Sequence, residues 1–347
     1  MSKFKKALNN PKIPYLIGEI ACIHEGNFEY LTKLVNEIIK KKACDAIKYH
    51  VLIDLNSHMT KSHEAYKLVS KLLLPKENWV SILKKTKSNN FEVIVLVDEL
   101  KSVDFVKNNI GFIDAVELHA VALNNIEMLE KLKDIPTPII LGIGGSEIDE
   151  IEFAINYLNR KDILLMHGFQ NYPTRYEYIN FNKMTMIKDK FNLPVGYADH
   201  TVWDNKNNEL ITIAGFMAGA NFIEKHVTLE LGKKRVDFNS AISVDMLSSI
   251  REKIELLNKT KGDGSFKINE YEQIYARNGP MKFTIVTNRN LKKGQLIKKE
   301  DITFRRTGEE NTIKQRDYLE LIGKKVKKDI PKFGLVNWEN VEKWEQQ

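Results

Sequence analysis

The sequence predicts an α/β fold: a TIM (β/α)8 barrel followed by a small β-rich C-terminal domain. Eight short runs rich in Ile, Val and Leu alternate with amphipathic stretches of helical spacing, such as YLTKLVNEIIKKKA. The chain has 347 residues, which accommodates a barrel of about 250 residues and a second module of about 60. A doubly wound sheet is the alternative, but EIACIHEG, after the first run, lacks the GxGxxG pattern of that fold.

The expected strands are short apolar runs, each followed by a polar or helical stretch. They span residues 15–20, 45–50, 92–97, 113–118, 138–143, 163–168, 194–199 and 221–226. After about residue 260 the pattern changes, because KGDGSFKINEYEQIYARNGP is polar and carries Gly and Pro. We therefore expect a barrel domain at 1–262, a linker at 263–282 and a compact β-rich domain at 283–347.

The composition of the chain argues against a nucleic-acid-binding protein and against a membrane-spanning protein. The formal net charge is +7, but the lysines are spread along the chain without interleaved aromatic residues, so we expect no nucleic-acid partner. A basic surface can still steer an anionic substrate. There is no apolar run of about 18 residues and no signal-peptide pattern, so we expect no membrane segment. The two cysteines, Cys22 and Cys44, lie in apolar contexts that suit a reducing cytoplasm.

Histidines gather at the expected strand ends, where the chemistry of a TIM barrel is located. Six of the eight lie at or just past these ends: His24, His50, His119, His167, His200 and His226. Imidazoles on adjacent strands can share one metal ion, with a nearby carboxylate completing the site. His200 and His226, at the ends of strands seven and eight, are the best pair for a divalent metal. The alternative is that each is a hydrogen-bonded loop residue.

Sequence motifs follow one another in a fixed order along nearly the whole chain. They are EIACIHEG, AIKYH, FQNYPTRYEYINF, VGYADHT, FIEKHVT and RVDFNSAIS. These resemble the motifs of the sialic acid synthase family, whose members join phosphoenolpyruvate to an N-acetylated sugar and make a nine-carbon 2-keto-3-deoxy acid. The runs KKGQLIKKEDITFRR and LIGKKVKKDIPKFG are similar to the antifreeze-like (SAF) domain that ends chains of this family. The resemblance implies a nonulosonic acid product for surface carbohydrate.

The resemblance also implies roles for residues near the metal. His200 and His226 match the family's manganese-binding histidines, so the expected cofactor is a divalent ion, Mn or Mg. Glu19 matches the first-strand glutamate near metal and substrate and is the candidate base of a family-type reaction. Lys48 matches the active-site lysine of the second strand.

Substrate contacts and a partner are implied in the same way. Tyr172 and Asp237 match positions that contact the sugar, and Gln170 stands where the family has an Asn before Y-P-T. Arg306 matches the arginine that one subunit's antifreeze-like domain extends into the active site of its partner. A domain-swapped homodimer is therefore expected, and the assignment is open by one position, between Arg305 and Arg306.

The departures from the family concentrate at one set of positions. Glu117 stands in place of a lysine, Ala120 and Ala198 in place of serines, and His50 in place of a glutamine; the third strand ends in Asp98 instead of the S-T-P-F motif. Most of these positions hold the phosphate and carboxylate of phosphoenolpyruvate in the family. Each charge-assisted hydrogen bond to a phosphate contributes about 1.5–3 kcal/mol. We therefore predict that phosphoenolpyruvate is not bound in the family's manner.

Three interpretations of the function follow. In the first, the chain joins an amino-sugar aldose to phosphoenolpyruvate, and other cations, such as Lys48, Lys225 or Arg175, hold the phosphate. In the third, the chain is a non-catalytic binder of sugar acids that kept the fold.

In the second interpretation, the chain is a divergent metal-dependent synthase or lyase. Its three-carbon donor is then a 2-oxo acid without phosphate, such as pyruvate, and the metal polarises the carbonyl group. His50, Glu117 or His119 would act as the base, and Glu117 and His119 would lie against the substrate.

Overall fold

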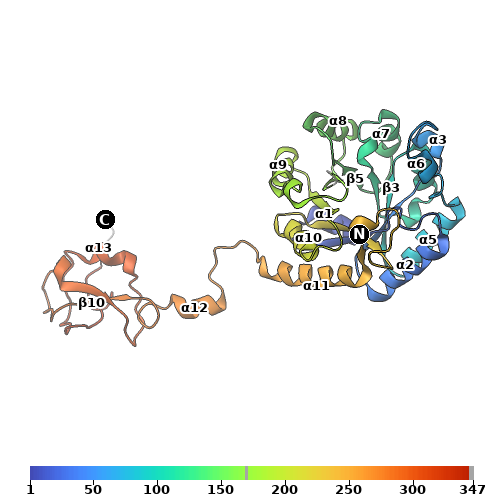
Figure 1. Ribbon diagram of the computed structural model, residues 1–347. Coiled ribbons are helices and arrows are strands. Elements are labelled where there is room, and N and C mark those ends of the chain that lie inside the picture. The colour runs from blue at the N-terminus through green and yellow to red at the C-terminus, as the bar shows by residue number, and fades with distance from the viewer. Residues whose placement is uncertain (169–170, 344–347) are drawn as a thin grey trace. The chain divides into compact units, whose positions relative to one another are not determined.

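In the computed structural model, which describes residues 1–168 and 171–343, eight parallel strands form a closed barrel (Figure 1). Each strand pairs with the next one in the chain, and β1 pairs with β8 to close the ring. The strands are β1 (Tyr15–Glu19), β2 (Ala46–His50), β3 (Glu92–Val97), β4 (Ala115–Leu118), β5 (Ile139–Gly142), β6 (Ile163–His167), β7 (Val195–Asp199) and β8 (Phe222–Thr228). The TIM-barrel prediction is confirmed, with each strand end within two residues of the expected one.

Helices surround the barrel, as Figure 1 shows. They are α2 (Phe28–Lys41), α3 (Leu55–His58), α4 (Tyr66–Val69), α5 (Lys76–Ser88), α6 (Leu100–Asn108), α7 (Ile126–Lys133), α8 (Ile148–Leu158), α9 (Phe181–Phe191), α10 (Asn208–Met217) and α11 (Val244–Thr260). Each longer helix turns an apolar face to the strands; α2, for example, buries Leu31, Leu34 and Ile38 at helical spacing. The short strand β9 (Ile242–Ser243) pairs with the end of β8.

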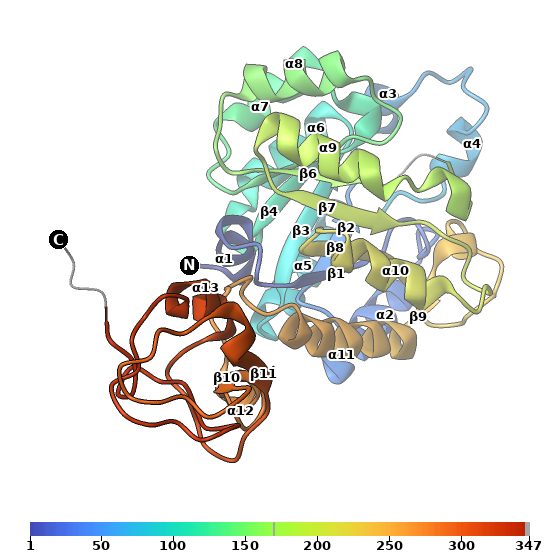
Figure 2. The same ribbon diagram turned by 90° about the vertical axis from the view of Figure 1, so that its left-hand side faces the viewer.

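One end of the barrel is closed by a short N-terminal helix, α1 (Lys3–Asn9). Figure 2 shows it at the end where the strands begin. Phe4 of α1 packs on the rings of Tyr15 and Phe222, with centroids 5.3 and 4.9 Å apart. Strand side chains alternate between the inside and the outside of a barrel. The side chains inside the barrel next to α1 are apolar. Polar side chains that point into the barrel therefore lie near its other end, where the strands finish.

The second unit begins at Asp263 and has its own apolar core. Its regular strands are β10 (Thr284–Thr287) and β11 (Ile302–Arg305), which pair antiparallel; isolated bridges connect much of the rest. Two short helices accompany them, α12 (Glu270–Ala276) and α13 (Tyr318–Leu321). Thus α12 lies within the segment expected to be a linker. Among the described residues, no helix is long and apolar enough to cross a membrane.

A candidate metal centre and a buried lysine at the barrel mouth

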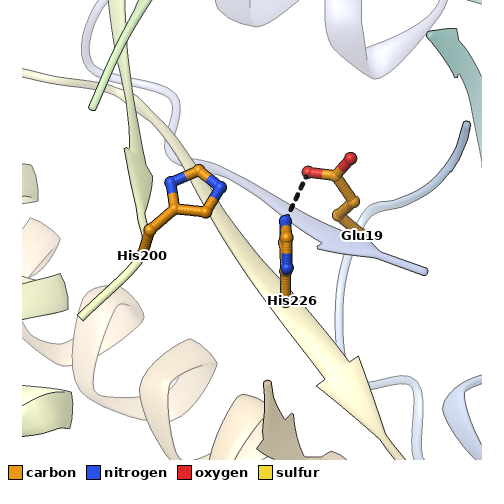
Figure 3. A group of neighbouring side chains, drawn as sticks. All are labelled: Glu19, His200 and His226. Atoms are coloured by element: carbon orange, nitrogen blue, oxygen red, sulfur yellow. Dashed lines mark ion pairs between the residues drawn. The ribbon is translucent and has the colours of Figure 1, made fainter. Parts of the chain in front are cut away.

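Two histidines and a glutamate meet at the mouth of the barrel (Figure 3). Glu19 ends β1, His200 follows β7, and His226 lies on β8, and all three are buried. Each offers one ligand atom, and these atoms lie within 4.8 Å of one another. His226 Nε2 lies 3.3 Å from Glu19 Oε2, and the two imidazole rings are 4.7 Å apart. The predicted histidine pair is therefore brought together with one carboxylate.

The chemistry of this cluster fits a divalent metal. Neighbouring ligand atoms on one divalent ion lie roughly 3.0 Å apart in octahedral and roughly 3.4 Å apart in tetrahedral geometry, close to the 3.3 Å between His226 and Glu19. His200 Nδ1 donates to the carbonyl oxygen of Ala198 at 3.2 Å, which leaves Nε2 with the lone pair. Burial and the neighbouring His226 lower the pKa of His200 to about 3, so its ring is neutral. A neutral imidazole is the form that binds a metal.

Below the cluster, a buried lysine stands among three carboxylates. Lys48 Nζ lies 3.0 Å from Glu19, 2.8 Å from Glu117 and 2.7 Å from Glu224. Burial opposes the charge of Lys48, but these carboxylates outweigh it and raise the pKa of Lys48 well above its usual value. For Glu19 burial acts to raise the pKa, yet the charges of Lys48 and His226 hold it well below the usual range. The ammonium group is thus fully compensated by protein carboxylates.

The two other carboxylates of this group hold their protons more tightly than usual. Burial raises the pKa of Glu224 well above its ordinary value, despite the attraction of Lys48. Burial also raises the pKa of Glu117, and the charge of Glu19 adds to the shift, while Lys48 opposes it. A buried carboxylate with a raised pKa is the form in which enzymes use a glutamate as an acid or a base near neutral pH.

The cations proposed as phosphate ligands are all engaged by carboxylates. Lys48 contacts Glu19, Glu117 and Glu224. Lys225 Nζ donates to Asp199 at 2.8 Å, and both side chains are fully buried. Arg175 forms an ion pair with Glu177. None of the three is placed as an uncompensated charge for a dianionic phosphate.

Two histidines, at the end of β2 and just after β4, have pKa values shifted in opposite directions. Their rings, His50 and His119, stack with centroids 5.8 Å apart. Burial lowers the pKa of His50, but Asp98, whose Oδ2 lies 2.8 Å from His50 Nε2, reverses the effect and raises it well above 6.5. Burial and the charge of His50 lower the pKa of His119 to about 4. The Val121 amide donates to His119 Nδ1 at 3.3 Å, so in the neutral ring Nε2 carries the hydrogen.

The residues expected to contact the sugar lie beside the metal-ligand cluster. The ring of Tyr172 is 6.3 Å from His200 and 6.4 Å from His226. Asp237 accepts a hydrogen bond from the Cys22 amide at 2.9 Å. Both line the same cavity of about 360 Å3 as Glu19, Lys48, His50, Glu117, His119, His200 and His226. Gln170 lies outside the described residues.

The candidate arginines lie in the second unit. Arg306 is exposed, and its Nε donates to the carbonyl oxygen of Pro280 at 2.9 Å. The guanidinium of Arg305 lies over the ring of Phe333, 4.4 Å from its centroid. Each arginine is thus held by a neighbour within its own unit.

Two residues of the site, Glu224 and Asp98, were not among the predicted catalytic, binding or metal-binding residues. Glu224 stands two positions before His226, so the period of two of a strand places both on the inner face of β8. That spacing could have identified it. Asp98 directly follows β3, and its partner His50 became evident only when β2 and β3 were placed side by side.

Comparison with known proteins agrees with the fold and the motifs. A TIM barrel that carries buried ionisable side chains at the carboxyl ends of its strands has the architecture of a TIM-barrel enzyme. The model of the NeuB family matches residues 36–266, and the model of the SAF domain matches residues 284–342. The first match covers more than half of the chain, so this protein belongs to the NeuB family. The predicted resemblance and the antifreeze-like C-terminal domain are both confirmed.

Individual relatives match over nearly the full length. An uncharacterized protein of Methanocaldococcus jannaschii is 30% identical, covering 94% of each chain. The N,N'-diacetyllegionaminic acid synthase of Campylobacter jejuni is 27% identical over 92% of this chain and 98% of its own. The solved N-acetylneuraminic acid synthetase of Leptospira borgpetersenii shares the fold, with a TM-score of 0.70 and 22% identity, covering 77% of this chain and 91% of that one.

Proposed function

We propose that this protein forms a carbon–carbon bond between an amino-sugar aldose and a three-carbon acid donor, making a nonulosonic acid for surface carbohydrate. The observation that carries the proposal is the cluster of Glu19, His200 and His226 in a cavity of about 360 Å3. Relatives that are synthases of legionaminic and pseudaminic acid support it. We also propose a cytoplasmic location, which suits such a biosynthetic step.

The same three side chains would hold a divalent metal, Mn or Mg. Such an ion supplies a Lewis acid that polarises a substrate oxygen. The protein's own part is to keep the ligands in their binding forms. Lys48 holds Glu19 ionised, burial keeps His200 neutral, and the ring of Tyr172 flanks both histidines.

For the donor, we propose a 2-oxo acid without phosphate, such as pyruvate. Phosphoenolpyruvate already contains the enol, whereas pyruvate needs a base to remove a proton from its methyl carbon. Glu117, in place of the family's lysine, removes a phosphate-binding cation and supplies a carboxylate of raised pKa at the same point. One substitution therefore weakens the binding of one donor and provides the base that the other requires.

The reaction then follows the course of an aldol addition. Glu117 takes a proton from the donor's methyl carbon, and that carbon attacks the aldehyde carbon of the sugar. The aldehyde oxygen receives a proton from His50, which Asp98 keeps protonated. Among the three candidate bases, His50 is protonated already and the lone pair of His119 accepts a backbone hydrogen bond, which favours Glu117.

We further propose a homodimer in which Arg306, or Arg305 beside it, reaches the partner's active site. Both arginines are exposed on the second unit. Light scattering of the full chain tests this: a dimer is expected, and a monomer at micromolar concentration would contradict it.

The function is tested by incubating the metal-loaded protein with an N-acetylated aldose and either pyruvate or phosphoenolpyruvate. Mass spectrometry measures the nine-carbon acid, and a phosphate assay measures release from the second donor. We expect product from pyruvate and its loss in Glu117→Gln. Product with phosphate release from phosphoenolpyruvate alone would restore the first interpretation. If neither donor gives product, the interpretation that remains is the third one, a non-catalytic binder of sugar acids.

A further inference from the structure

The side chains of Cys22, His50 and Asp98 form a chain of contacts at the barrel mouth. His50 Nε2 is 2.8 Å from Asp98 Oδ2, and the other ring nitrogen, Nδ1, is 3.8 Å from the sulfur of Cys22. Cys22 follows β1, His50 ends β2, and Asp98 follows β3, so three consecutive strands bring them together. A thiol beside an imidazole that a carboxylate orients is the arrangement of an activated nucleophile.

The sulfur has access to substrate. Cys22 is only partly buried and lines the same cavity as Glu19 and the two metal-cluster histidines. The second cysteine, Cys44, is the internal contrast. It is 2% exposed. Burial raises the pKa of both thiols, to about 12 at Cys44, and at Cys22 the charge of His50 opposes that rise.

The backbone around Cys22 is fixed in an uncommon conformation. Ala21 has a φ of 46°, in the left-handed region that residues with a Cβ seldom adopt. The Cys22 amide donates to Asp237 Oδ2 at 2.9 Å, which anchors the turn to a distant part of the chain. Strained backbone conformations of this kind cluster at active sites, ligand clamps and switch regions.

Asp98 can also accept a hydrogen bond from a ligand. Its side chain is 3% exposed, and its second oxygen, Oδ1, accepts no hydrogen bond from the described residues. It lines a cavity of about 80 Å3 that Cys22 and His50 also line. A buried carboxylate oxygen without a donor is costly unless something else, such as a ligand hydroxyl, donates to it.

We propose that Cys22, His50 and Asp98 form a nucleophilic thiol site that adds reversibly to the carbonyl carbon of a substrate. The sulfur bonds to that carbon, and the π electrons of the C=O bond move to its oxygen. The oxygen receives the proton of His50, which takes the thiol's proton in exchange. The product is a hemithioacetal or hemithioketal, and nothing is oxidised or reduced. The inference rests on the proposed function for its carbonyl compounds, an open-chain aldose or a 2-oxo acid.

The adduct is tested directly by carbon-13 NMR on the full chain. The probes are pyruvate labelled at its ketone carbon and N-acetylmannosamine labelled at its aldehyde carbon. We expect, with one probe, a protein-bound resonance of a sulfur-bonded tetrahedral carbon, distinct from the sugar's ring hemiacetal and from pyruvate hydrate and absent in Cys22→Ser. A signal with pyruvate identifies the donor as the trapped compound, and a signal with the sugar identifies the acceptor. Neither measurement needs turnover, so its result is independent of the synthase assay.

Alkylation by iodoacetamide, resolved by mass spectrometry, tests the activation of the thiol. We expect Cys22 to react at least tenfold faster in the wild type than in His50→Gln, and also to slow in Asp98→Asn. Cys44 serves as the control, because loosening of the fold would speed its reaction, whereas loss of positioning by Asp98 leaves it unchanged. Equal rates at Cys22 in wild type and His50→Gln, or no Cys22-dependent resonance with either probe, would overturn the proposal.

Discussion

Exchanging Glu117 for lysine should restore binding of phosphoenolpyruvate. In the present chain, Lys48 is contacted by Glu19, Glu117 and Glu224, so no positive charge remains for a phosphate. In Glu117→Lys, two ammonium groups would face the two remaining carboxylates. The two positive charges would then balance the two negative charges before the ligand binds. A dianionic donor would meet a second ammonium group where the third carboxylate now stands.

The size of the effect follows from two contributions. A phosphate about 4 Å from an ionised carboxylate is repelled by about 4 kcal/mol per charge pair at an effective dielectric constant of about 20. The introduced ammonium group adds a charge-assisted hydrogen bond of about 1.5–3 kcal/mol. Because the raised pKa of Glu117 allows it to escape part of the repulsion by taking up a proton, we count only about 3 kcal/mol in total. That corresponds to roughly a hundredfold tighter binding.

Isothermal titration calorimetry with phosphoenolpyruvate and with pyruvate measures this change. Glu117→Gln is the matched control, since it removes the charge without adding a cation and should give an intermediate gain. Both variants should lose pyruvate-dependent turnover, because each lacks the proposed base. The reasoning is refuted if wild-type protein already binds phosphoenolpyruvate as tightly as the folded Glu117→Lys variant.

The remaining predictions concern the metal, the buried lysine and pH. His200→Ala and His226→Ala should each abolish metal uptake in equilibrium dialysis, whereas His63→Ala, on an exposed loop, should not; normal uptake by both would disprove the ligand assignment. Lys48→Met should lower the unfolding free energy in urea by about 3–5 kcal/mol, because it leaves buried carboxylates without a cation, and a loss below about 1 kcal/mol would contradict this. The folded pKa of His119, about 4, lies below its unfolded value of about 6.5, so the unfolded state binds more protons between these values and acid destabilises the wild type. Relative to His119→Asn, the wild type should lose about 1–2 kcal/mol between pH 7 and pH 5, and an unchanged difference would exclude a neutral buried ring.

The barrel could be predicted from the sequence because its signals are local. Apolar runs and helical spacing repeat along the chain and need no knowledge of long-range contacts. The pair of His200 and His226 was predicted for the same reason, since parallel strands in a barrel end on one face. The catalytic and substrate-binding roles of the selected residues remain predictions.

What only the tertiary structure decided is which charges meet and in which protonation state. Glu19 and His226 are 207 positions apart in the sequence, yet they are direct partners in the register of β1 and β8. The sequence showed that Glu117 had replaced a lysine, but not that its carboxylate would lie on Lys48. Burial and through-space charge set a pKa, and neither is a property of a residue's sequence neighbours. The fold was therefore determined by local pattern, and the chemistry of the metal cluster and its buried lysine by closure of the barrel.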